Sequence, residues 1–345
     1  MSESKQRQNH TETDHIMSSS GIRSVNVIAP ARLHLGFLDL NGGLGRGFGS
    51  IGLYLDEIVT ELSLEPAGNI SANGPSADRA SRNAELLLSH LNLDSGVTIQ
   101  IKRAIPEHIG LGSGTQMAMA VGMGLNRLLD LQLSTRELVS VLDRGRRSGV
   151  GIGAFNLGGF IVDGGRSETT IVPPVIAHSD IPAEWRFILI QDKAYQGIHG
   201  IDEINAFEQL PPMDEAIVGI ICRLVVMQAL PAICEQDCEL FGKAISRIQE
   251  LVGSYFAPVQ GGIYLSPAVE QAARLLEKYG ATGTGQSSWG PTGFAIYANE
   301  TDAYHAIKLA RNNTADHIEL NICKARNRGA GIKIEEPMVG NIRKQ

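Results

Sequence analysis

Cysteine is scarce in this sequence. The chain of 345 residues contains four cysteines, Cys222, Cys234, Cys238 and Cys323, with no Cys-x-x-Cys spacing and no histidine pair nearby. Disulfide frameworks and structural zinc sites both depend on such closely spaced sets. The sequence therefore argues against either, and it favours reduced thiols in a cytoplasmic protein.

Positive charge is also in short supply. The chain has 30 lysines and arginines against 37 acidic residues, which gives a net charge of −7 at pH 7. Because general nucleic-acid-binding proteins are basic, this balance argues against nucleic acid as a partner. Any anion site must then be a local basic patch within an acidic protein.

Long uninterrupted apolar runs are missing as well. Residues 1–20 are polar and lack the apolar core of a signal peptide, so we expect a disordered tail. The most apolar stretch, residues 216–233, contains Arg223, Gln228 and Pro231. We expect a buried helix there rather than a membrane span, and therefore no membrane partner.

Aromatic residues make up only 5% of the chain, whereas glycines number 39. The most informative glycines are Gly110, Gly112 and Gly114, in the segment Ile-Pro-Glu-His-Ile-Gly-Leu-Gly-Ser-Gly-Thr-Gln at residues 105–116. A strand-like alternation over residues 97–105 precedes this loop, and apolar residues at helical spacing follow it.

This loop has the order of parts that an anion site requires. Bare glycine backbone at a helix start offers N–H groups and the positive end of the helix dipole. The loop is not a Walker A motif, because no Gly-Lys-Ser/Thr follows, and it is not a dinucleotide fingerprint. We predict a phosphate or pyrophosphate cradle, with a plain strand-to-helix turn as the alternative.

The remaining pattern predicts an α+β chain in two parts. Strands are expected at residues 25–28, 32–35, 53–55, 58–62, 97–105, 158–163, 185–190 and 292–297. Helices are expected at residues 77–91, 134–147, 214–230, 236–252, 267–279 and 302–312. A proline-rich stretch at 172–182 marks the boundary between an N-terminal domain with the phosphate loop, residues 21–175, and a C-terminal domain, residues 180–335.

The segment Pro-Ala-Arg-Leu-His-Leu-Gly-Phe-Leu-Asp at residues 30–39 combines a polar face with an apolar one. If residues 32–36 are extended, Arg32, His34 and Gly36 share one side and two leucines share the other. A cation, an imidazole and a bare backbone would suit a phosphorylated substrate. A solvent-facing edge with an incidental histidine explains the pattern about equally well.

Three further segments carry groups suited to ligand binding. Arg144, Arg146 and Arg147 precede a glycine run, where they could bind phosphate with paired hydrogen bonds or only solvate a helix end. Residues 282–293 surround a tryptophan with small polar residues, which suggests a second loop on the same ligand.

An acidic pair, Asp202 and Glu203, lies close to His199. Magnesium takes one or two carboxylates together with substrate oxygens, so the pair could hold Mg²⁺. Adjacent acids in the first turn of a helix are the alternative.

Taken in order, Pro30-Ala-Arg32, Gly110-Leu-Gly-Ser-Gly114 and residues 283–293 resemble the motifs of the GHMP small-molecule kinase superfamily. Gly114 replaces the second serine of the kinase loop. The segments Gly-Leu-Gly-Ser-Gly-Thr-Gln, Arg-Ser-Gly-Val-Gly-Ile-Gly-Ala-Phe and Gly-Gln-Ser-Ser-Trp-Gly-Pro-Thr instead resemble the β-ribofuranosylaminobenzene 5′-phosphate synthase family.

The resemblance implies a fold and a reaction. The fold is the two-domain GHMP architecture, with an N-terminal ribosomal-S5-like domain and a C-terminal ferredoxin-like domain, in a homodimer. The enzyme would be a pentosyltransferase of methanopterin biosynthesis. Phosphoribosyl pyrophosphate would condense with 4-aminobenzoate or 4-hydroxybenzoate, releasing CO₂ and pyrophosphate, with Mg²⁺ as the cofactor.

The resemblance and the residue chemistry together give expected roles. The expected substrate- and phosphate-binding residues are Arg32, Gly110, Gly112, Ser113, Gly114, Thr115, Gln116, Arg144, Arg146, Arg147, Gln286, Ser287 and Ser288. Asp202 or Glu203 would help to hold the metal. His34, Asp39 or His199 would act as the base that raises the electron density of the ring.

Two other functions stay open on the sequence. An ATP-dependent GHMP kinase is the first, although Gly114 counts against it. A non-catalytic member that binds a sugar phosphate and regulates a partner is the second, and His34, Asp39 and the acidic pair count against that.

Overall fold

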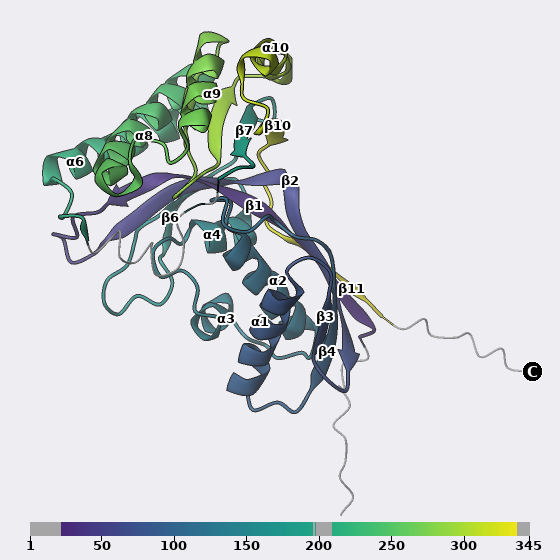
Figure 1. Cartoon of the computed structure of the whole chain (residues 1–345). Coiled ribbons are helices and arrows are strands. Elements are labelled where there is room, and N and C mark those ends of the chain that lie inside the picture. The colour runs from purple at the N-terminus through teal and green to yellow at the C-terminus, as the bar shows by residue number, and fades with distance from the viewer. Residues whose placement is uncertain (1–21, 196, 198–208, 337–345) are drawn as a thin grey trace, which may run out of the picture.

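The structure is a computed structural model that describes residues 22–195, 197 and 209–336. Within these ranges helices and strands are mixed along the chain, and the strands form two separate sheets, as the α+β prediction requires. Figure 1 shows the helices of the first part, in blue to teal, below its long strands, and the helices of the second part, in green to yellow, above them.

The first sheet has seven strands within the described residues, in the order β11-β1-β2-β4-β3, with β5 paired to β2 and β6 to β5. Their bounds are β1 Ser24–Asp39, β2 Phe48–Ala67, β3 Ser71–Asn73, β4 Gly96–Arg103, β5 Phe160–Asp163, β6 Val175–Ser179 and β11 Gly331–Glu335. Apart from the parallel pair β3 and β4, neighbouring strands run antiparallel.

The helices on this sheet are α1 Ala77–His90, α2 Ser113–Leu128, α3 Thr135–Val141 and α4 Val150–Leu157. The apolar residues of α2 are buried against the sheet, as their helical spacing predicts. Ser134 caps α3 in a capping box with Glu137, but α3 ends at Val141, well before the expected residue 147. The arginines at 144, 146 and 147 therefore lie on a loop, not on a helix end.

The second sheet, in the order β10-β7-β9-β8, has four strands among the described residues: β7 Arg186–Asp192, β8 Gly283–Gln286, β9 Gly293–Tyr297 and β10 Ile318–Lys324. Its helical elements are α6 Glu215–Leu224, η1 Val225–Ala229, α7 Leu230–Glu235, α8 Cys238–Gln260, α9 Pro267–Lys278, α10 Glu300–Ala310 and η2 Arg311–Asn313.

Strand β1 connects the two parts and is longer than the sequence predicts. The expected break at Pro30 is absent, and the strand runs unbroken for 16 residues. The proline is accommodated by an irregularity in pairing between Pro30 and Arg32, and a second one follows between His34 and Gly36. Such irregularities bend a strand and re-aim its side chains, here at the position of the expected polar face.

The first sheet includes strands from both sides of the expected division at residues 175–180. Strand β11 belongs to the expected C-terminal range 180–335, but it pairs with β1 in the first sheet. One core cluster also joins both parts, because Leu33 and Phe160 of the first part pack in the same cluster as Phe241 and Phe294 of the second.

Residues 216–233 are helical as expected, but the expectation that this helix is buried is wrong, because most of its surface is exposed. The helix runs over Glu215–Glu235, and 28% of its most apolar window is buried. It packs against α8 on one side, while Ile220, Val226 and Met227 are exposed. By length and composition it is the single helix among the described residues that could cross a membrane.

Candidate functional site

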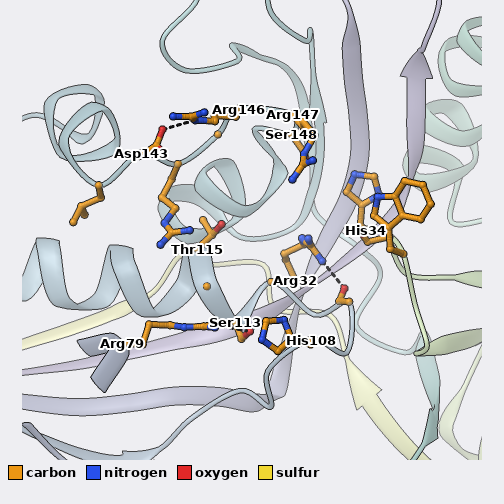
Figure 2. A pocket seen from close by; sticks show the side chains of 18 of the residues that line it. Arg32, His34, Arg79, His108, Ser113, Thr115, Asp143, Arg146, Arg147 and Ser148 are labelled. Atoms are coloured by element: carbon orange, nitrogen blue, oxygen red, sulfur yellow. Dashed lines mark hydrogen bonds and ion pairs between the residues drawn. The ribbon is translucent and has the colours of Figure 1, made fainter. Parts of the chain in front are cut away.

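A cleft of about 660 Å³ opens where the loop before α2 meets the loop after β8. Among the described residues, six arginines line this cleft: Arg32, Arg79, Arg82, Arg144, Arg146 and Arg147. We call it the cationic cleft. Figure 2 shows Arg32 near its centre, with Arg79 and His108 on one side and Arg147 and Ser148 on another. An acidic protein thus concentrates positive charge at one place.

The N-terminus of α2 forms one wall of the cationic cleft. Its N-cap, Gly112, has a left-handed backbone (φ 79°) and no side chain to cap the first turn. At Gly114 a Cβ would lie 3.6 Å from Nη1 of Arg79 and 3.7 Å from Nη1 of Arg144. Two guanidinium groups therefore flank the helix start, where backbone N–H groups and the helix dipole already favour an anion.

The two guanidinium groups are held differently. Arg79 donates to Glu107 at 2.7 Å and has a long contact of 3.5 Å to Ser113 Oγ. Arg144 has a buried Nε with no hydrogen-bond partner. Burial, and then the positive charge of Arg79, lower the pKa of Arg144 from its ordinary value. Arg79 is thus held by Glu107, whereas the buried Nε of Arg144 is left to an anionic ligand.

Arg32 ties strand β1 to the phosphate loop. Its backbone N–H donates to Leu111 at 3.1 Å, and its Nη1 donates to the carbonyl of Gly110 at 2.5 Å. Its side-chain stem lies over Gly112, where a Cβ would be 2.9 Å from Cγ of Arg32. A glycine is therefore required at residue 112 both for the backbone angle and for the approach of Arg32.

The loop after β8 meets the same place, as the small polar residues around Trp289 suggested. Ser287 Oγ donates to the carbonyl of Gly110 at 2.7 Å and accepts from the backbone N–H of His34 at 3.0 Å. Ser288 and Trp289 line the cationic cleft. The three segments singled out in the sequence thus come together at one point.

His34 sits at the boundary between charge and apolar surface. Its side chain is 2% exposed and lies 4.7 Å from the ring of Phe37, centroid to centroid. Burial, with the nearby charge of Arg32, lowers the pKa of His34 well below its ordinary value of 6.5. The imidazole is therefore neutral at pH 7.

Behind His34 lies a recess of about 20 Å³, enough for roughly one water molecule, which we call the aromatic chamber. Its walls include Phe37, Phe256, Ile263 and Trp289, and the rings of Phe256 and Trp289 are 4.4 Å apart. His34 and Trp289 line both the chamber and the cationic cleft. The chamber is too small for an aromatic ring, so an aromatic part of a ligand would lie in the cleft, against the faces of Phe37 and Trp289 that line it.

Two expected residues lie away from the cleft. Gln116 is fully buried, accepts a hydrogen bond from the Tyr54 hydroxyl at 2.9 Å and donates to the carbonyl of Gly151 at 2.9 Å. Asp39 accepts from the backbone N–H groups of Asn41 and Gly42 in a turn. The expectations of a substrate-binding Gln116 and a catalytic Asp39 are therefore corrected, since each side chain serves the local fold.

Gln286, an expected substrate-binding residue, lines the aromatic chamber but not the cationic cleft. Its Oε1 accepts from the backbone N–H of Leu265 at 2.7 Å. Its amide therefore shapes the chamber wall.

The expected metal and base residues of the acidic segment, His199, Asp202 and Glu203, lie outside the described residues. Among the residues that are described, no group of three His, Cys, Asp or Glu side chains could hold a metal ion. Asp143, a carboxylate lining the cationic cleft, is engaged by Arg146 at 2.5 Å. We therefore assign no metal ligand among the described side chains, and we derive no reaction step through the metal.

Sequence reasoning missed Arg79, Arg82 and His108, which also line the cationic cleft. The signal for the first two was present, because residues three apart share a face of the helix predicted at 77–91. Nothing local shows that this face lies over the phosphate loop. The ion pair of Arg79 with Glu107 brings the two segments together.

A buried carboxylate, also missed, lies behind one wall of the cleft. Asp163 is fully buried and accepts from the backbone N–H groups of Gly149 and Gly165, each at 2.9 Å. Ser50 Oγ lies 2.5 Å from Asp163 Oδ2 and 2.6 Å from Oγ of Ser148, which lines the cleft. Burial raises the pKa of Asp163, and these hydrogen bonds act in the opposite direction.

Comparison with known proteins identifies the family. Residues 78–162 match the family described as GHMP kinases N terminal domain, and residues 229–313 match GHMP kinases C terminal. The chain is 33% identical to the beta-ribofuranosylphenol 5′-phosphate synthase of Archaeoglobus fulgidus, over 88% of this chain and 98% of that protein. It is 31% identical to the protein of that name from Methanocaldococcus jannaschii, over 77% and 88% of the two chains.

The chain belongs to the beta-ribofuranosylphenol 5′-phosphate synthase family. The crystal structure of a homoserine kinase from Cytophaga hutchinsonii aligns with a TM-score of 0.63 and 17% identity, covering 92% of this chain and all of that one. At that identity the likeness shows the fold alone. The two-domain GHMP fold predicted from the sequence motifs is thereby confirmed.

Proposed function

We propose that this protein is a pentosyltransferase that joins phosphoribosyl pyrophosphate to 4-hydroxybenzoate, with release of CO₂ and pyrophosphate. The product is a C-riboside, β-ribofuranosylphenol 5′-phosphate, on the route to methanopterin-type cofactors. The observation that carries the proposal is the meeting of the cationic cleft with an aromatic wall at His34. The relatives are named for a ribofuranosylphenol product, which favours 4-hydroxybenzoate over 4-aminobenzoate.

The cationic cleft suits the phosphoribosyl donor. This substrate has a pyrophosphate at one end and a 5′-phosphate at the other, so it needs cations spread over a cleft. The start of α2, with Arg79 and Arg144, gives fixed donors for the pyrophosphate. Donors placed in advance stabilise the negative charge that develops as pyrophosphate leaves. Arg147, on the loop before α4, lines the same cleft, and we place the 5′-phosphate on this side.

The aromatic wall suits the acceptor ring. Phe37 and Trp289 line the cationic cleft and give it an aromatic wall. His34, neutral because its pKa is lowered by burial, accepts the phenolic proton of the acceptor. Removal of that proton raises the electron density at the ring carbon that carries the carboxylate.

The steps balance without a redox partner. The ring carbon bearing the carboxylate attacks C1 of the ribose, and the C–O bond to pyrophosphate breaks with its electron pair on pyrophosphate. The carbon–carboxylate bond then breaks, CO₂ leaves, and its electron pair restores the aromatic phenolate. His34 returns the proton to the phenolate, so the base is regenerated within one turnover.

Three earlier expectations stay proposals. They are Mg²⁺ as a cofactor, a homodimer and a cytoplasmic location. The proposed ligands of the metal are still Asp202 and Glu203, which lie outside the described residues. A bound magnesium ion would supply further charge for the leaving pyrophosphate.

The test is a product assay with purified protein. It contains Mg²⁺, phosphoribosyl pyrophosphate and carboxyl-labelled 4-hydroxybenzoate, with labelled 4-aminobenzoate in parallel. We expect labelled CO₂ and pyrophosphate in equal amounts. Absence of CO₂ from both benzoates would overturn the proposal, and ATP consumption on a small alcohol would then favour a kinase.

A further inference from the structure

Strand β1 carries a bulge directly after His34. The partners of His34 and Gly36 are adjacent residues of β2, so Leu35 is an extra residue in β1. A bulge of this kind bends its strand and re-aims the neighbouring side chains. The imidazole of the proposed base therefore takes its direction from the groups that hold this bulge.

Those groups come from the second part of the molecule. The backbone N–H of His34 donates to Ser287 Oγ at 3.0 Å, and the carbonyl of Leu35 accepts from Nε2 of Gln249 at 2.8 Å. Oε1 of Gln249 accepts from the backbone N–H of Gln286, the residue before Ser287, at 2.7 Å. One side-chain amide of α8 thus ties the bulge of β1 to the end of β8.

The orientation of this amide is fixed at both ends. A carbonyl group only accepts and a backbone N–H only donates, so the amide nitrogen of Gln249 faces Leu35 and its oxygen faces Gln286. Two glycines let α8 come close enough. A Cβ at Gly285 would lie 2.4 Å from Cγ of Gln249, and a Cβ at Gly36, where φ is 142°, would lie 2.8 Å from a side chain of α8.

We propose that Gln249 is a positioning residue for the proposed reaction, whose amide holds the bulge of β1 and so sets the direction of the His34 imidazole. Gln249 lines the aromatic chamber but not the cationic cleft, so it has no place in the proposed anion site and acts through His34. The inference rests on the proposed function, since it takes His34 as the base.

The informative variant is Gln249→Glu, which keeps the shape of the side chain and makes its hydrogen bond to Leu35 depend on pH. A protonated carboxyl group donates to Leu35 and accepts from Gln286, as the amide does, whereas a carboxylate cannot donate. Partial burial and the facing carbonyl oxygen disfavour the charged form, so this carboxyl group should titrate above the ordinary glutamate pKa of about 4.3. Lowering the pH should therefore restore the junction.

The first measurement is kcat between pH 8 and pH 6, divided at each pH by the wild-type value so that effects common to both proteins cancel. The ratio for Gln249→Glu should be about 0.1 at pH 8, as for one lost hydrogen bond, and should rise toward 1 as the pH falls. The ratio for Gln249→Met should stay low at every pH. In both variants the Michaelis constant for phosphoribosyl pyrophosphate and the affinity for pyrophosphate should not change.

The matched control is Gln271→Glu, which changes an exposed glutamine of α9 in the same way. Its kcat should equal the wild-type value at each pH.

Other titratable groups surround Gln249, and Gln249→Met controls for them. They line the aromatic chamber or a neighbouring pocket that Gln249 also lines, and they are His34, Arg247, Glu250, Tyr264, Arg274 and Glu277. Burial raises the pKa of Tyr264 to about 12, so this phenol stays neutral between pH 6 and pH 8. Because Gln249→Met keeps all of these groups, a pH effect confined to Gln249→Glu belongs to the new carboxyl group.

A second measurement follows the bulge without catalysis. The protection of the His34 amide from hydrogen exchange, measured by nuclear magnetic resonance and corrected for the intrinsic rate, reports its hydrogen bond to Ser287. Protection should fall in Gln249→Met at every pH, and in Gln249→Glu only as the pH rises. If this pattern is found but the wild type releases no CO₂ in the product assay, the proposed reaction fails while the hold of Gln249 on the bulge stands.

Three results would overturn the inference. They are a wild-type kcat in Gln249→Met, a kcat ratio and an amide protection in Gln249→Glu that do not depend on pH, and a loss of pyrophosphate affinity as large as the loss of kcat. The last would show that Gln249 supports the whole junction of the two parts and not the direction of His34.

Discussion

At the scale of single residues, the proposed reaction depends most directly on His34 as the base. The change His34→Gln keeps a polar side chain of similar length but removes the base. General base catalysis contributes about 10²- to 10⁴-fold, so we expect kcat to fall by at least about 10²-fold. The Michaelis constant for phosphoribosyl pyrophosphate should change little, because the arginines remain.

The pH dependence gives an independent check of the same residue. The pKa of His34 lies well below 6.5, so the neutral base persists as the pH falls through 6.5. In the wild type we expect kcat to be flat from about pH 8 to pH 6.5 and to fall only at lower pH. A decline of kcat centred at or above pH 6.5 would contradict the assignment. The free energy of unfolding should also fall as the pH drops below 6.5. In that range the histidine of the unfolded chain binds a proton while buried His34 does not, so protons favour the unfolded state.

Arg144 offers a prediction in which binding and stability move apart. Arg144→Met removes a guanidinium with a buried, unpartnered Nε and a repulsive neighbour, Arg79. We expect the affinity for pyrophosphate to fall about 10- to 100-fold, as for a lost charged hydrogen bond. The melting temperature of the ligand-free protein should stay level or rise, because the folded state no longer confines two like charges.

The matched control for Arg144 is Arg103→Ala. It removes an exposed arginine of β4 that pairs with Glu61 of β2. It should leave the affinity for pyrophosphate unchanged. A large drop in the melting temperature of Arg144→Met would mean that Arg144 is structural.

Residues of the site could be predicted where the chemistry is local. Arg32, His34 and the glycines of the phosphate loop were each predicted from one segment, and the structure places them at the cationic cleft. Arg79 and Asp163 were missed, since their roles come from contacts with Glu107 and Ser50 that are distant in the chain. Gln116 was wrongly assigned because sequence adjacency to the loop does not say which way a helical side chain points.

At the scale of elements, the start of α2 depends on Gly112. Gly112→Val places a β-branched residue at φ 79° and drives its Cβ toward Arg32. We expect a loss of about 1–3 kcal/mol in the free energy of unfolding from backbone strain, and a clear loss of affinity for pyrophosphate as Arg32 is displaced. Thermal unfolding and calorimetry measure the two effects.

Gly45 provides the control for this substitution. Its φ is 75°, close to that of Gly112, but a Cβ there meets nothing within 4 Å. Gly45→Val should cost similar strain and leave pyrophosphate binding intact. If both variants bind equally well, the approach of Arg32 to Gly112 has no part in the site.

Elements were predictable in type and less so in extent. Helix α2 and strand β4 follow from period alone. Strand β1 continues through Pro30 because the pairing with β2 absorbs the proline in an irregularity. The helix after Ser134 stops at Val141, ahead of left-handed residues at Asp143 and Gly145. These outcomes depend on neighbours that a single segment does not reveal.

At the scale of the whole molecule, the two sheets share one core around β1. Phe241 of α8 is fully buried and packs edge-on to Phe160 of β5, with ring centroids 5.7 Å apart. Phe241→Ala should lower the free energy of unfolding by about 3–5 kcal/mol. Because the core is shared, unfolding in urea should remain a single transition by circular dichroism and by tryptophan fluorescence. Two separated transitions would show that the parts fold independently.

The site itself belongs to this scale, since it exists only where the two parts meet. Its phosphate loop comes from the first part and the loop carrying Ser287 and Trp289 from the second, joined by the bond from Ser287 to Gly110. The family motifs predict that these loops belong to one protein. That the cationic cleft and the aromatic chamber share His34 and Trp289 could be seen only in the folded chain.

The most direct measurement of the central claim is a single-turnover experiment that follows CO₂ and pyrophosphate together in the wild type, His34→Gln and Arg144→Met. The account predicts one CO₂ per pyrophosphate in the wild type, with both products slowed equally in His34→Gln at saturating substrate. In Arg144→Met both should be restored toward the wild-type rate by more phosphoribosyl pyrophosphate. Wild-type rates of CO₂ release in both variants at low substrate concentration would contradict the claim that this cleft is the active site.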